Sequence, residues 1–237
     1  MFAIIIFANI IFAQDEMIKI SDDLELRRIS KNAYIHISYH DLQNYRHLSA
    51  NGLIYFEKSK AFIIDTPWTN EQTRILVNWL RDSLELETEG VIATHWHNDC
   101  MGGLNEIKKM GIKTYSHKLT REITQSNNLP VPQFDFQDSL ILKLNENKII
   151  CYYFGAGHTV DNIVVWIPEE KILFGGCMVK TLRQRNLGFT GDANLKEWPN
   201  TLKKLLKKFP ESRIVIPGHG DYGDLSLIQH TIELLRE

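Results

Sequence analysis

Four short apolar runs of this chain each lead into a histidine or a cysteine that has glycines close by. They are VIA before Thr94-His95-Trp96-His97-Asn98-Asp99 and Gly102-Gly103, IICYYF before Gly155-Ala156-Gly157-His158-Thr159, KILF before Gly175-Gly176-Cys177, and RIVI before Pro217-Gly218-His219-Gly220. Apolar runs bounded by turn residues are typical of buried β-strands, and glycine allows the chain to turn sharply after them. In layered α/β proteins, ligands gather at the carboxyl ends of the strands. The pattern therefore predicts that four strand ends supply one site.

The first of these segments has the side chains of a metal site. His95, His97 and Asp99 alternate in the sequence, and an extended or turn geometry can bring them together. Imidazole and carboxylate groups are suitable zinc ligands. Alone, this segment is also compatible with a polar surface loop, and His158 or His219 alone would more often be structural. The conjunction of the four segments favours a metal centre.

The periodicity of apolar residues predicts an α/β protein. The expected strands span 24–29, 33–39, 52–57, 60–65, 91–93, 112–116, 138–145, 148–154, 162–167, 171–176 and 213–216. The expected helices span 70–86, 102–110, 117–126, 195–208 and 225–236, and Thr69-Asn70-Glu71-Gln72 reads as a capping box for the first. Strands followed by helices occur twice without a Pro- or Gly-rich linker. This order predicts two packed sheets with helices on the outer faces.

Length and composition limit the number of domains and the kind of partner. A chain of 237 residues can build one sizeable core, and we treat 15–237 as one domain. A hydrophobic content of 43% with 24% charged residues is ordinary for a soluble globular protein. The net charge of -2 gives no electrostatic reason to expect nucleic acid or an anionic membrane. We expect a monomer with a small-molecule substrate, no nucleic-acid partner and no stable insertion in a membrane.

The N-terminus has the pattern of a targeting segment. The run MFAIIIFANIIFA carries no charge, and Asn9 is its one polar side chain. It is too short to cross a bilayer as a helix but fits the apolar core of a secretory signal peptide, with Ala13 before the cleavage point. A buried N-terminal strand is the alternative. We assign residues 1–14 to a signal peptide, which predicts a periplasmic protein.

The three cysteines do not form a disulfide framework, because at least one of them must stay unpaired. In an oxidising compartment a free thiol is a liability unless it is buried or holds a metal. We therefore expect Cys177 to hold a metal and Cys151 to lie in the core. Cys100 is expected to flank the metal site without binding it.

These motifs resemble those of the metallo-β-lactamase superfamily, and the resemblance spans the chain from about Ile20 to Leu235. Members that hydrolyse glutathione thioesters or nucleic acids usually have a histidine at the place of Cys100 and an aspartate at the place of Cys177. A Gly-Gly-Cys segment with Lys180 three residues on resembles class B β-lactamases of the first subclass. The match extends to Ile64-Asp65-Thr66-Pro67-Trp68, Gly191-Asp192-Ala193-Asn194, Glu197-Trp198-Pro199 and Pro217-Gly218-His219-Gly220-Asp221.

The resemblance implies a four-layer αββα sandwich of two mixed sheets and two zinc ions per chain. By analogy His95, His97 and His158 hold the first ion, and Asp99, Cys177 and His219 hold the second. The implied activity is zinc-dependent hydrolysis of the β-lactam amide bond of antibiotics, which confers antibiotic resistance. A zinc-bound water has a lowered pKa, so hydroxide is available as the nucleophile, and Asp99 is the residue that orients it.

Two polar residues are assigned supporting roles. The resemblance makes Lys180 the partner of the substrate carboxylate, although a solvated lysine at a strand end is the alternative. Asp65 ends a strand and is expected to form hydrogen bonds behind the metal ligands. A simple turn aspartate before Pro67 is the alternative for Asp65.

Two departures from the relatives concern the substrate groove. Phe189 stands where related enzymes often place an asparagine that faces the lactam carbonyl. The polar segment 40–48 lacks the glycines of the relatives' mobile flap and is expected to be a long hairpin loop. Its apolar residues Leu42 and Tyr45 are expected to face Phe189 across the groove.

Two other functions remain open at this stage. The first is another hydrolase of the same fold, a thioesterase or a lactonase, which Cys100 and Cys177 disfavour. The second is a non-catalytic periplasmic zinc-binding protein. A closed structural zinc site needs only four ligands and no open position, so the six-ligand set disfavours that function too.

Overall fold

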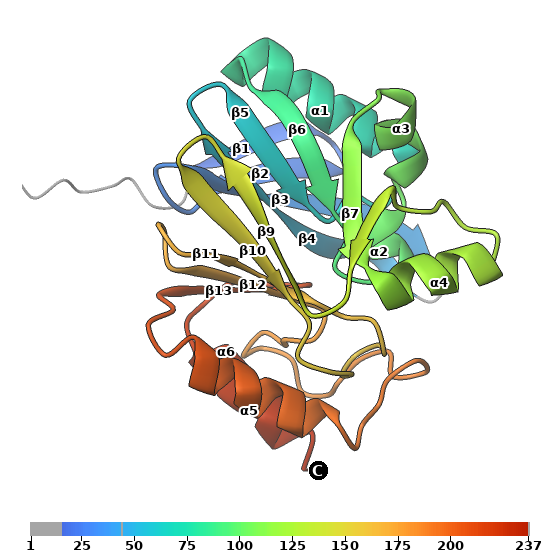
Figure 1. Cartoon of the computed structure of the whole chain (residues 1–237), viewed down its shortest axis with the longest axis vertical. Helices are drawn as coiled ribbons and strands as arrows, with labels where there is room; N and C mark the ends of the chain where they lie inside the picture. The colour runs from blue at the N-terminus through green and yellow to red at the C-terminus, as the bar shows by residue number, and fades with distance from the viewer. Residues whose placement is uncertain (1–15, 44, 237) are drawn as a thin grey trace, which may run out of the picture.

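The computed structural model describes residues 16–43 and 45–236 and arranges them in four layers (Figure 1). Two β-sheets face one another, and helices cover their outer sides, so the expected αββα sandwich is confirmed. Residues 1–14, which we assign to a signal peptide, lie outside the described residues.

The first sheet contains β1 (Met17–Ser21), β2 (Leu24–Arg28), β3 (Ala33–Leu42), β4 (Tyr45–Glu57), β5 (Lys60–Ile64), β6 (Glu87–Ile92), β7 (Lys113–His117) and β8 (Phe134–Phe136), in that spatial order. The second contains β13 (Ile214–Pro217), β12 (Ile172–Gly176), β11 (Val164–Ile167), β10 (Asn147–Tyr152) and β9 (Ser139–Leu144). The helices are α1 (Asn70–Leu84), α2 (Asn98–Met101), α3 (Leu104–Lys109), α4 (Lys118–Ser126), α5 (Trp198–Lys208) and α6 (Ser226–Leu234).

Both sheets are mixed. In the first sheet β1 to β5 pair antiparallel, whereas β5 to β8 pair parallel. In the second sheet only the β12–β13 pair is parallel. Parallel strands have their carboxyl ends at the same edge of a sheet, and ligands collect there. The segments that follow β6, β12 and β13 carry His95, Cys177 and His219.

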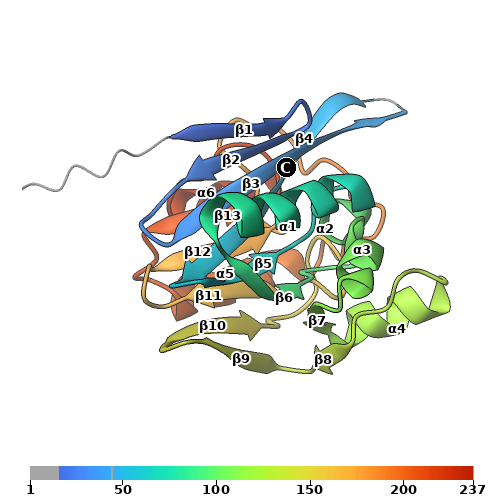
Figure 2. The same ribbon diagram turned by 90° about the horizontal axis from the view of Figure 1, so that it is seen from above.

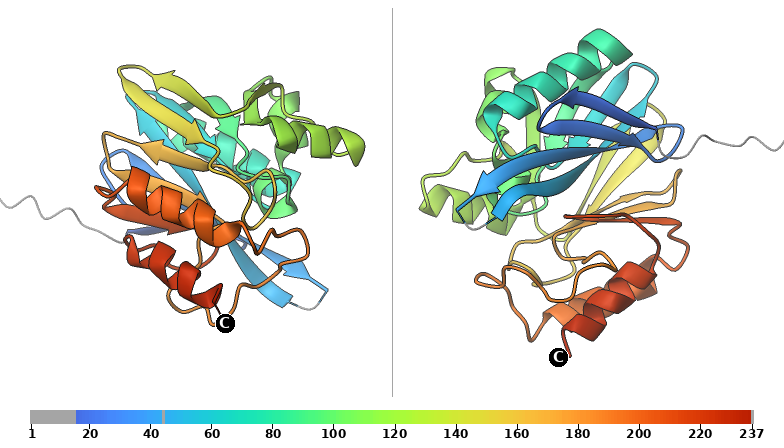
Figure 3. Two further views of the ribbon diagram at one scale, coloured as in Figure 1. Left: turned by 60° about the horizontal axis from the view of Figure 1, so that its bottom comes forward. Right: turned by 180° about the vertical axis from the view of Figure 1, so that it is seen from behind.

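Three apolar clusters fill the three spaces between the four layers. The alternation of side chains along β5 shows this division: Phe62 and Ile64 point into the cluster between the sheets, and Ala61 and Ile63 point towards α1. The third cluster lies under α5 and α6, which cover the outer face of the second sheet (Figure 3). A strand that is buried on both faces has consecutive apolar residues, so runs of apolar residues in the sequence were sufficient to predict these strands.

The start of α1 is where the capping pattern placed it. The Thr69 side chain accepts a hydrogen bond from the backbone N–H of Gln72, at 3.2 Å. The Gln72 side chain instead donates to the carbonyls of Asp23 and Tyr39, at 3.2 and 2.7 Å. The side chain that would complete a capping box therefore ties α1 to the first sheet.

The expectation of a loop over 40–48 is wrong. β3 and β4 remain paired up to Leu42 and Tyr45, so this segment is the tip of a two-stranded hairpin. The tip projects beyond the rest of the sheet (Figure 2). Because its residues are largely exposed on both faces, their sequence lacks the alternation of a half-buried strand.

Three smaller differences concern short elements. The helix expected over 102–110 is split into α2 and α3, which meet at Gly102 and Gly103, and β1 and β8 were not expected. Added side-chain carbons at these two glycines would lie 1.9 Å from the Trp68 carbonyl oxygen and 1.8 Å from Thr73 Oγ1. The two glycines therefore permit close packing against α1. None of the helices among the described residues is long and apolar enough to span a membrane.

Candidate metal centre

The four segments singled out in the sequence come together at one place. His95, His97 and Asp99 follow β6 in the first sheet. The second sheet supplies the others: His158 lies between β10 and β11, Cys177 follows β12, and His219 follows β13. The six side chains form two adjacent groups, which we call the histidine group (His95, His97 and His158) and the mixed group (Asp99, Cys177 and His219).

The histidine group presents three imidazoles to one point. One nitrogen of each ring lies within 4.8 Å of the others, and His158 Nε2 is 3.2 Å from His97 Nδ1. The His158 ring is close to perpendicular to the other two, at 84° to His95 and 85° to His97. Three converging nitrogens with no acid among them are a typical set for one zinc ion.

Asp192 fixes the orientation of His97. Its Oδ2 lies 2.9 Å from His97 Nε2 and accepts a hydrogen bond from that nitrogen, while Nδ1 faces His158. Metal-binding histidines are commonly held in this way. The sequence motif Gly191-Asp192-Ala193-Asn194 contains this residue, but nothing in its spacing from His97 reveals the contact.

The mixed group offers one oxygen, one sulfur and one nitrogen. Asp99 Oδ2 is 3.1 Å from Cys177 Sγ and 3.2 Å from His219 Nε2, and the sulfur is 3.5 Å from that nitrogen. His219 Nδ1 donates a hydrogen bond to the Ser49 carbonyl, which leaves Nε2 available as a ligand. Carboxylate, thiolate and imidazole together also suit zinc.

The turn that carries His219 is fixed by β4. Asn51 donates its side-chain amide to the carbonyls of Pro217 and Gly220, at 2.9 and 2.8 Å. Its backbone N–H donates to the carbonyl of Gly218, at 2.8 Å. The three hydrogen bonds enclose His219 on both sides, and sequence patterns gave no sign of this role.

Asp65 lies behind the histidine group and is buried. Its two oxygens accept hydrogen bonds from the backbone N–H and the hydroxyl of Thr94, at 2.7 and 2.8 Å. The same hydroxyl is 3.2 Å from His95 Nδ1. Burial raises the pKa of Asp65 to about 7, against the opposing effects of His95 and of the Thr94 hydrogen bonds. Asp65 therefore acts on His95 through Thr94.

The two groups differ in electrostatics. Burial lowers the pKa of His158 to about 2, so this imidazole is neutral. In the mixed group, the hydrogen bond from Cys100 and the positive charge of His219 hold the pKa of Cys177 well below its ordinary value. Burial disfavours charge on His219, but the Cys177 charge and the Asp99 hydrogen bond raise its pKa well above the ordinary value. Burial also disfavours charge on His95, but the hydrogen bond and charge of Cys177 and the charge of Asp99 raise its pKa to about 9. The mixed group is thus an ion-paired site whose charges extend to His95, and His158 is the imidazole that burial keeps neutral.

Cys100 lies beside both groups. Its sulfur is 3.3 Å from His95 Nδ1, and burial raises the pKa of its thiol well above the ordinary value. Cys151 is also fully buried, in the cluster between the sheets, where burial raises the pKa of its thiol. Cys151 therefore belongs to the core, as expected.

The residues expected to contact substrate differ in their exposure to solvent. Lys180 is 5% exposed, with Nζ 5.4 Å over the Trp198 ring, and burial lowers its pKa. Phe189 is 63% exposed, and its ring lies 5.7 Å from that of His97. Leu42 and Tyr45 are exposed at the tip of the β3–β4 hairpin.

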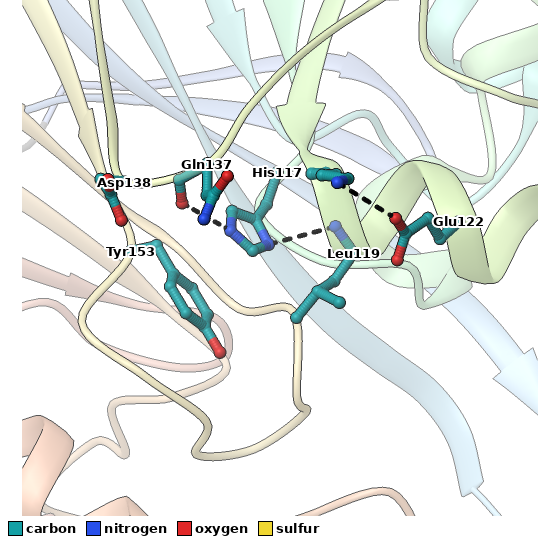
Figure 4. A pocket seen from close by; sticks show the side chains of 7 residues that line it. His117, Leu119, Glu122, Gln137, Asp138 and Tyr153 are labelled. Atoms are coloured by element: carbon teal, nitrogen blue, oxygen red, sulfur yellow. Dashed lines mark hydrogen bonds and ion pairs between the residues drawn. The ribbon is translucent and has the colours of Figure 1, made fainter.

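A separate hollow of about 280 Å³ lies beside α4, lined in part by His117, Glu122 and Tyr153 (Figure 4). The His117 ring stacks on Tyr153 with centroids 4.1 Å apart. Both nitrogens of that ring already have partners, the Gln137 carbonyl and the Leu119 N–H. His117 therefore has a structural role in this hollow.

Comparison with known proteins agrees with this geometry. The family model described as "Metallo-beta-lactamase superfamily" matches residues 47–219. The chain belongs to this superfamily. A metallo-beta-lactamase type 2 of Bacteroides fragilis is 41% identical over 220 residues, which cover 93% of this chain and 88% of the relative. A metallo-beta-lactamase type 2 of Pseudomonas aeruginosa is 36% identical over 211 residues, which cover 89% of this chain and 84% of the relative.

Solved structures of metallo-beta-lactamases have the same fold. The enzyme from Pontibacter korlensis superposes with a TM-score of 0.87 at 37% identity, covering 90% of this chain and 99% of that one. A crystal structure of VMB-1 gives a TM-score of 0.87 at 40% identity, covering 91% of this chain and 98% of that one. The metallo-beta-lactamase fold thus extends over nearly the whole described chain, and the family implies bound metal ions.

Proposed function

We propose that the protein is an exported β-lactamase that uses two zinc ions to hydrolyse the β-lactam amide bond of antibiotics and thereby confers resistance. The observation that carries this proposal is the adjacency of the histidine group and the mixed group, both facing the same edge of the sandwich. Zinc held there would supply a water of lowered pKa as nucleophile and would polarise the lactam carbonyl.

Each group fits one ion. His95, His97 and His158 would hold the first, and Asp99, Cys177 and His219 would hold the second. Asp99 lies between them, since its Oδ1 is 3.9 Å from His95 Nε2 while its Oδ2 contacts Cys177 and His219. A carboxylate in this position can accept a hydrogen bond from the attacking water and orient it towards the lactam.

Lys180 binds the carboxylate that common β-lactam drugs carry. None of the ion pairs among the described residues includes this lysine, although its side chain is buried. An unpaired buried ammonium gains from a substrate anion because burial strengthens their attraction. The position of Lys180 in the turn after Cys177 places this charge close to the mixed group.

The apolar walls of the groove are Phe189 and the hairpin residues Leu42 and Tyr45. Phe189 lies next to His97, and an aromatic ring there can pack against the side groups of a lactam but cannot donate to its carbonyl. The hairpin reaches the centre through Trp68, whose ring lies between those of His40 and His219, at 5.7 and 6.5 Å.

The decisive experiment is hydrolysis of a chromogenic cephalosporin by the purified protein, with zinc, with chelator and with zinc restored. We expect close to two zinc ions per chain by metal analysis, complete loss of hydrolysis on chelation, and recovery with zinc. A glutathione thioester assayed in parallel should not be hydrolysed. Full activity after confirmed removal of metal would refute the mechanism, and faster thioester hydrolysis would assign the protein to another branch of the family.

A further inference from the structure

Cys100 has no role in the proposed hydrolysis, yet its sulfur lies among metal ligands. The side chain is 2% exposed. Its Sγ, Cys177 Sγ, a nitrogen of His95 and an oxygen of Asp99 all lie within 4.8 Å of one another. Two sulfurs, one nitrogen and one oxygen therefore share one buried space.

This set of four donors differs in kind from the two groups above. The histidine group and the mixed group have three protein ligands each, which leaves a position open for water and substrate. Four protein donors that include two sulfurs complete a tetrahedron, as structural zinc sites do. Soft cations prefer thiolates to imidazole and carboxylate, so a second sulfur favours them over harder ones.

We propose that Cys100 and Cys177, with His95 and Asp99, form a closed site that takes a thiophilic divalent cation of the cadmium class. Cys177 binds as the thiolate it already is, Cys100 releases its thiol proton to solvent as its sulfur–metal bond forms, and no electron is transferred. Because His95 belongs to the histidine group and Cys177 to the mixed group, a cation held in this way withdraws ligands from both. The site goes beyond the proposed hydrolysis, which uses Cys177 but not Cys100.

The test is a titration of the metal-free protein with cadmium in the presence of a phosphine reductant. The readout is the ultraviolet charge-transfer band between thiolate and cadmium, which grows with the number of bound sulfurs. We expect the band of the wild type to be about two-fold that of Cys100→Ser at one cadmium per chain, because two thiolates bind in place of one. Cys151→Ser is the matched control, since Cys151 is an equally buried thiol far from the ligands, and should keep the full band.

Equal bands for the wild type and Cys100→Ser would overturn the proposal. If circular dichroism shows that Cys100→Ser is unfolded, cadmium NMR of the wild type decides, because the chemical shift differs between one-sulfur and two-sulfur sites. A one-sulfur shift would overturn the proposal equally. Neither readout depends on turnover, so a failure of lactam hydrolysis with zinc would leave this result intact.

Discussion

The histidine group and the mixed group lie side by side, and the pKa values of His158 in the first and His219 in the second are shifted in opposite directions. The histidine group consists of imidazoles, and burial keeps His158 neutral. The mixed group holds a thiolate, a carboxylate and a histidine whose pKa is raised by their charges. A cation that binds His95 or His219 must displace a proton, because Cys177 and Asp99 raise the pKa of both, whereas His158 has no proton to lose. The comparison shows that burial and charge can shift the pKa values of neighbouring imidazoles in opposite directions.

The strongest way to separate the groups is to remove the sulfur. We expect Cys177→Ser to weaken the second zinc ion by more than about 100-fold, because a neutral hydroxyl replaces a thiolate and losing a supporting residue alone costs 10–100-fold. Metal analysis after dialysis should then show close to one zinc per chain. Cys151→Ser should bind zinc like the wild type. Equal zinc loss in both variants would show that the cysteines are wrongly assigned.

The corresponding test of the histidine group replaces Asp192, which forms a hydrogen bond with His97. Asp192→Asn keeps the size of the side chain but removes the charge that orients His97, so the first zinc should bind about 10–100-fold more weakly. Competition with a fluorescent zinc chelator measures this affinity. Asp82→Asn, on the exposed surface of α1, is the control and should bind zinc unchanged. If Asp192→Asn weakened the binding of the second zinc ion only, Asp192 would not be the residue that orients His97.

The electrostatic contrast predicts opposite pH dependences in the metal-free protein. The pKa of His158 is lower in the folded than in the unfolded state, so its contribution to stability is present above pH 6.5 and declines on acidification. The difference in unfolding free energy between the wild type and His158→Gln should shrink by about 2 kcal/mol from pH 7 to pH 5.

For His219 the sign is reversed. Its folded pKa is raised, so its contribution is fully present below pH 6.5 and is lost as the pH rises through the folded value. The difference between the wild type and His219→Gln should therefore shrink towards alkaline pH. Urea unfolding with chelator at acidic, neutral and alkaline pH measures both differences. If the two differences in unfolding free energy changed in the same direction with pH, the contrast between His158 and His219 would be refuted.

The smallest effect is expected at the edge of the histidine group. Phe189→Asn introduces an amide that can donate to the lactam carbonyl, and such a hydrogen bond is worth about 1 kcal/mol. The ratios of kcat/KM among a penicillin, a cephalosporin and a carbapenem should change several-fold, with zinc content unaltered. Identical ratios would show that Phe189 does not line the groove.

The sequence predicted the parts of the molecule that local chemistry determines. The six residues of the histidine group and the mixed group stand in motifs at strand ends. The strands of both sheets are buried, so apolar runs located them. The tip of the β3–β4 hairpin was mistaken for a loop because Leu42 and Tyr45 are exposed and no buried face imposes alternation. Short β8 offers too few residues to establish any period.

Contacts between distant segments could not be predicted in the same way. Asp192 touches a histidine 95 positions away, and Asn51 holds a turn 166 positions away. Such pairs depend on how the two sheets pack, which no periodicity encodes. Cys100 was expected to flank the site, but its shared space with Cys177 depends on the same packing.

The division of ligands between the two sheets has a consequence for motion. Each group takes ligands from both: His95, His97 and Asp99 from the first, and His158, Cys177 and His219 from the second. A bound cation would therefore cross-link the two halves of the sandwich as well as activate water. Removing the cation should let the two halves separate more often. The rate of amide hydrogen exchange along β4 and β12 should then increase more than the rate along α1 on the outer layer.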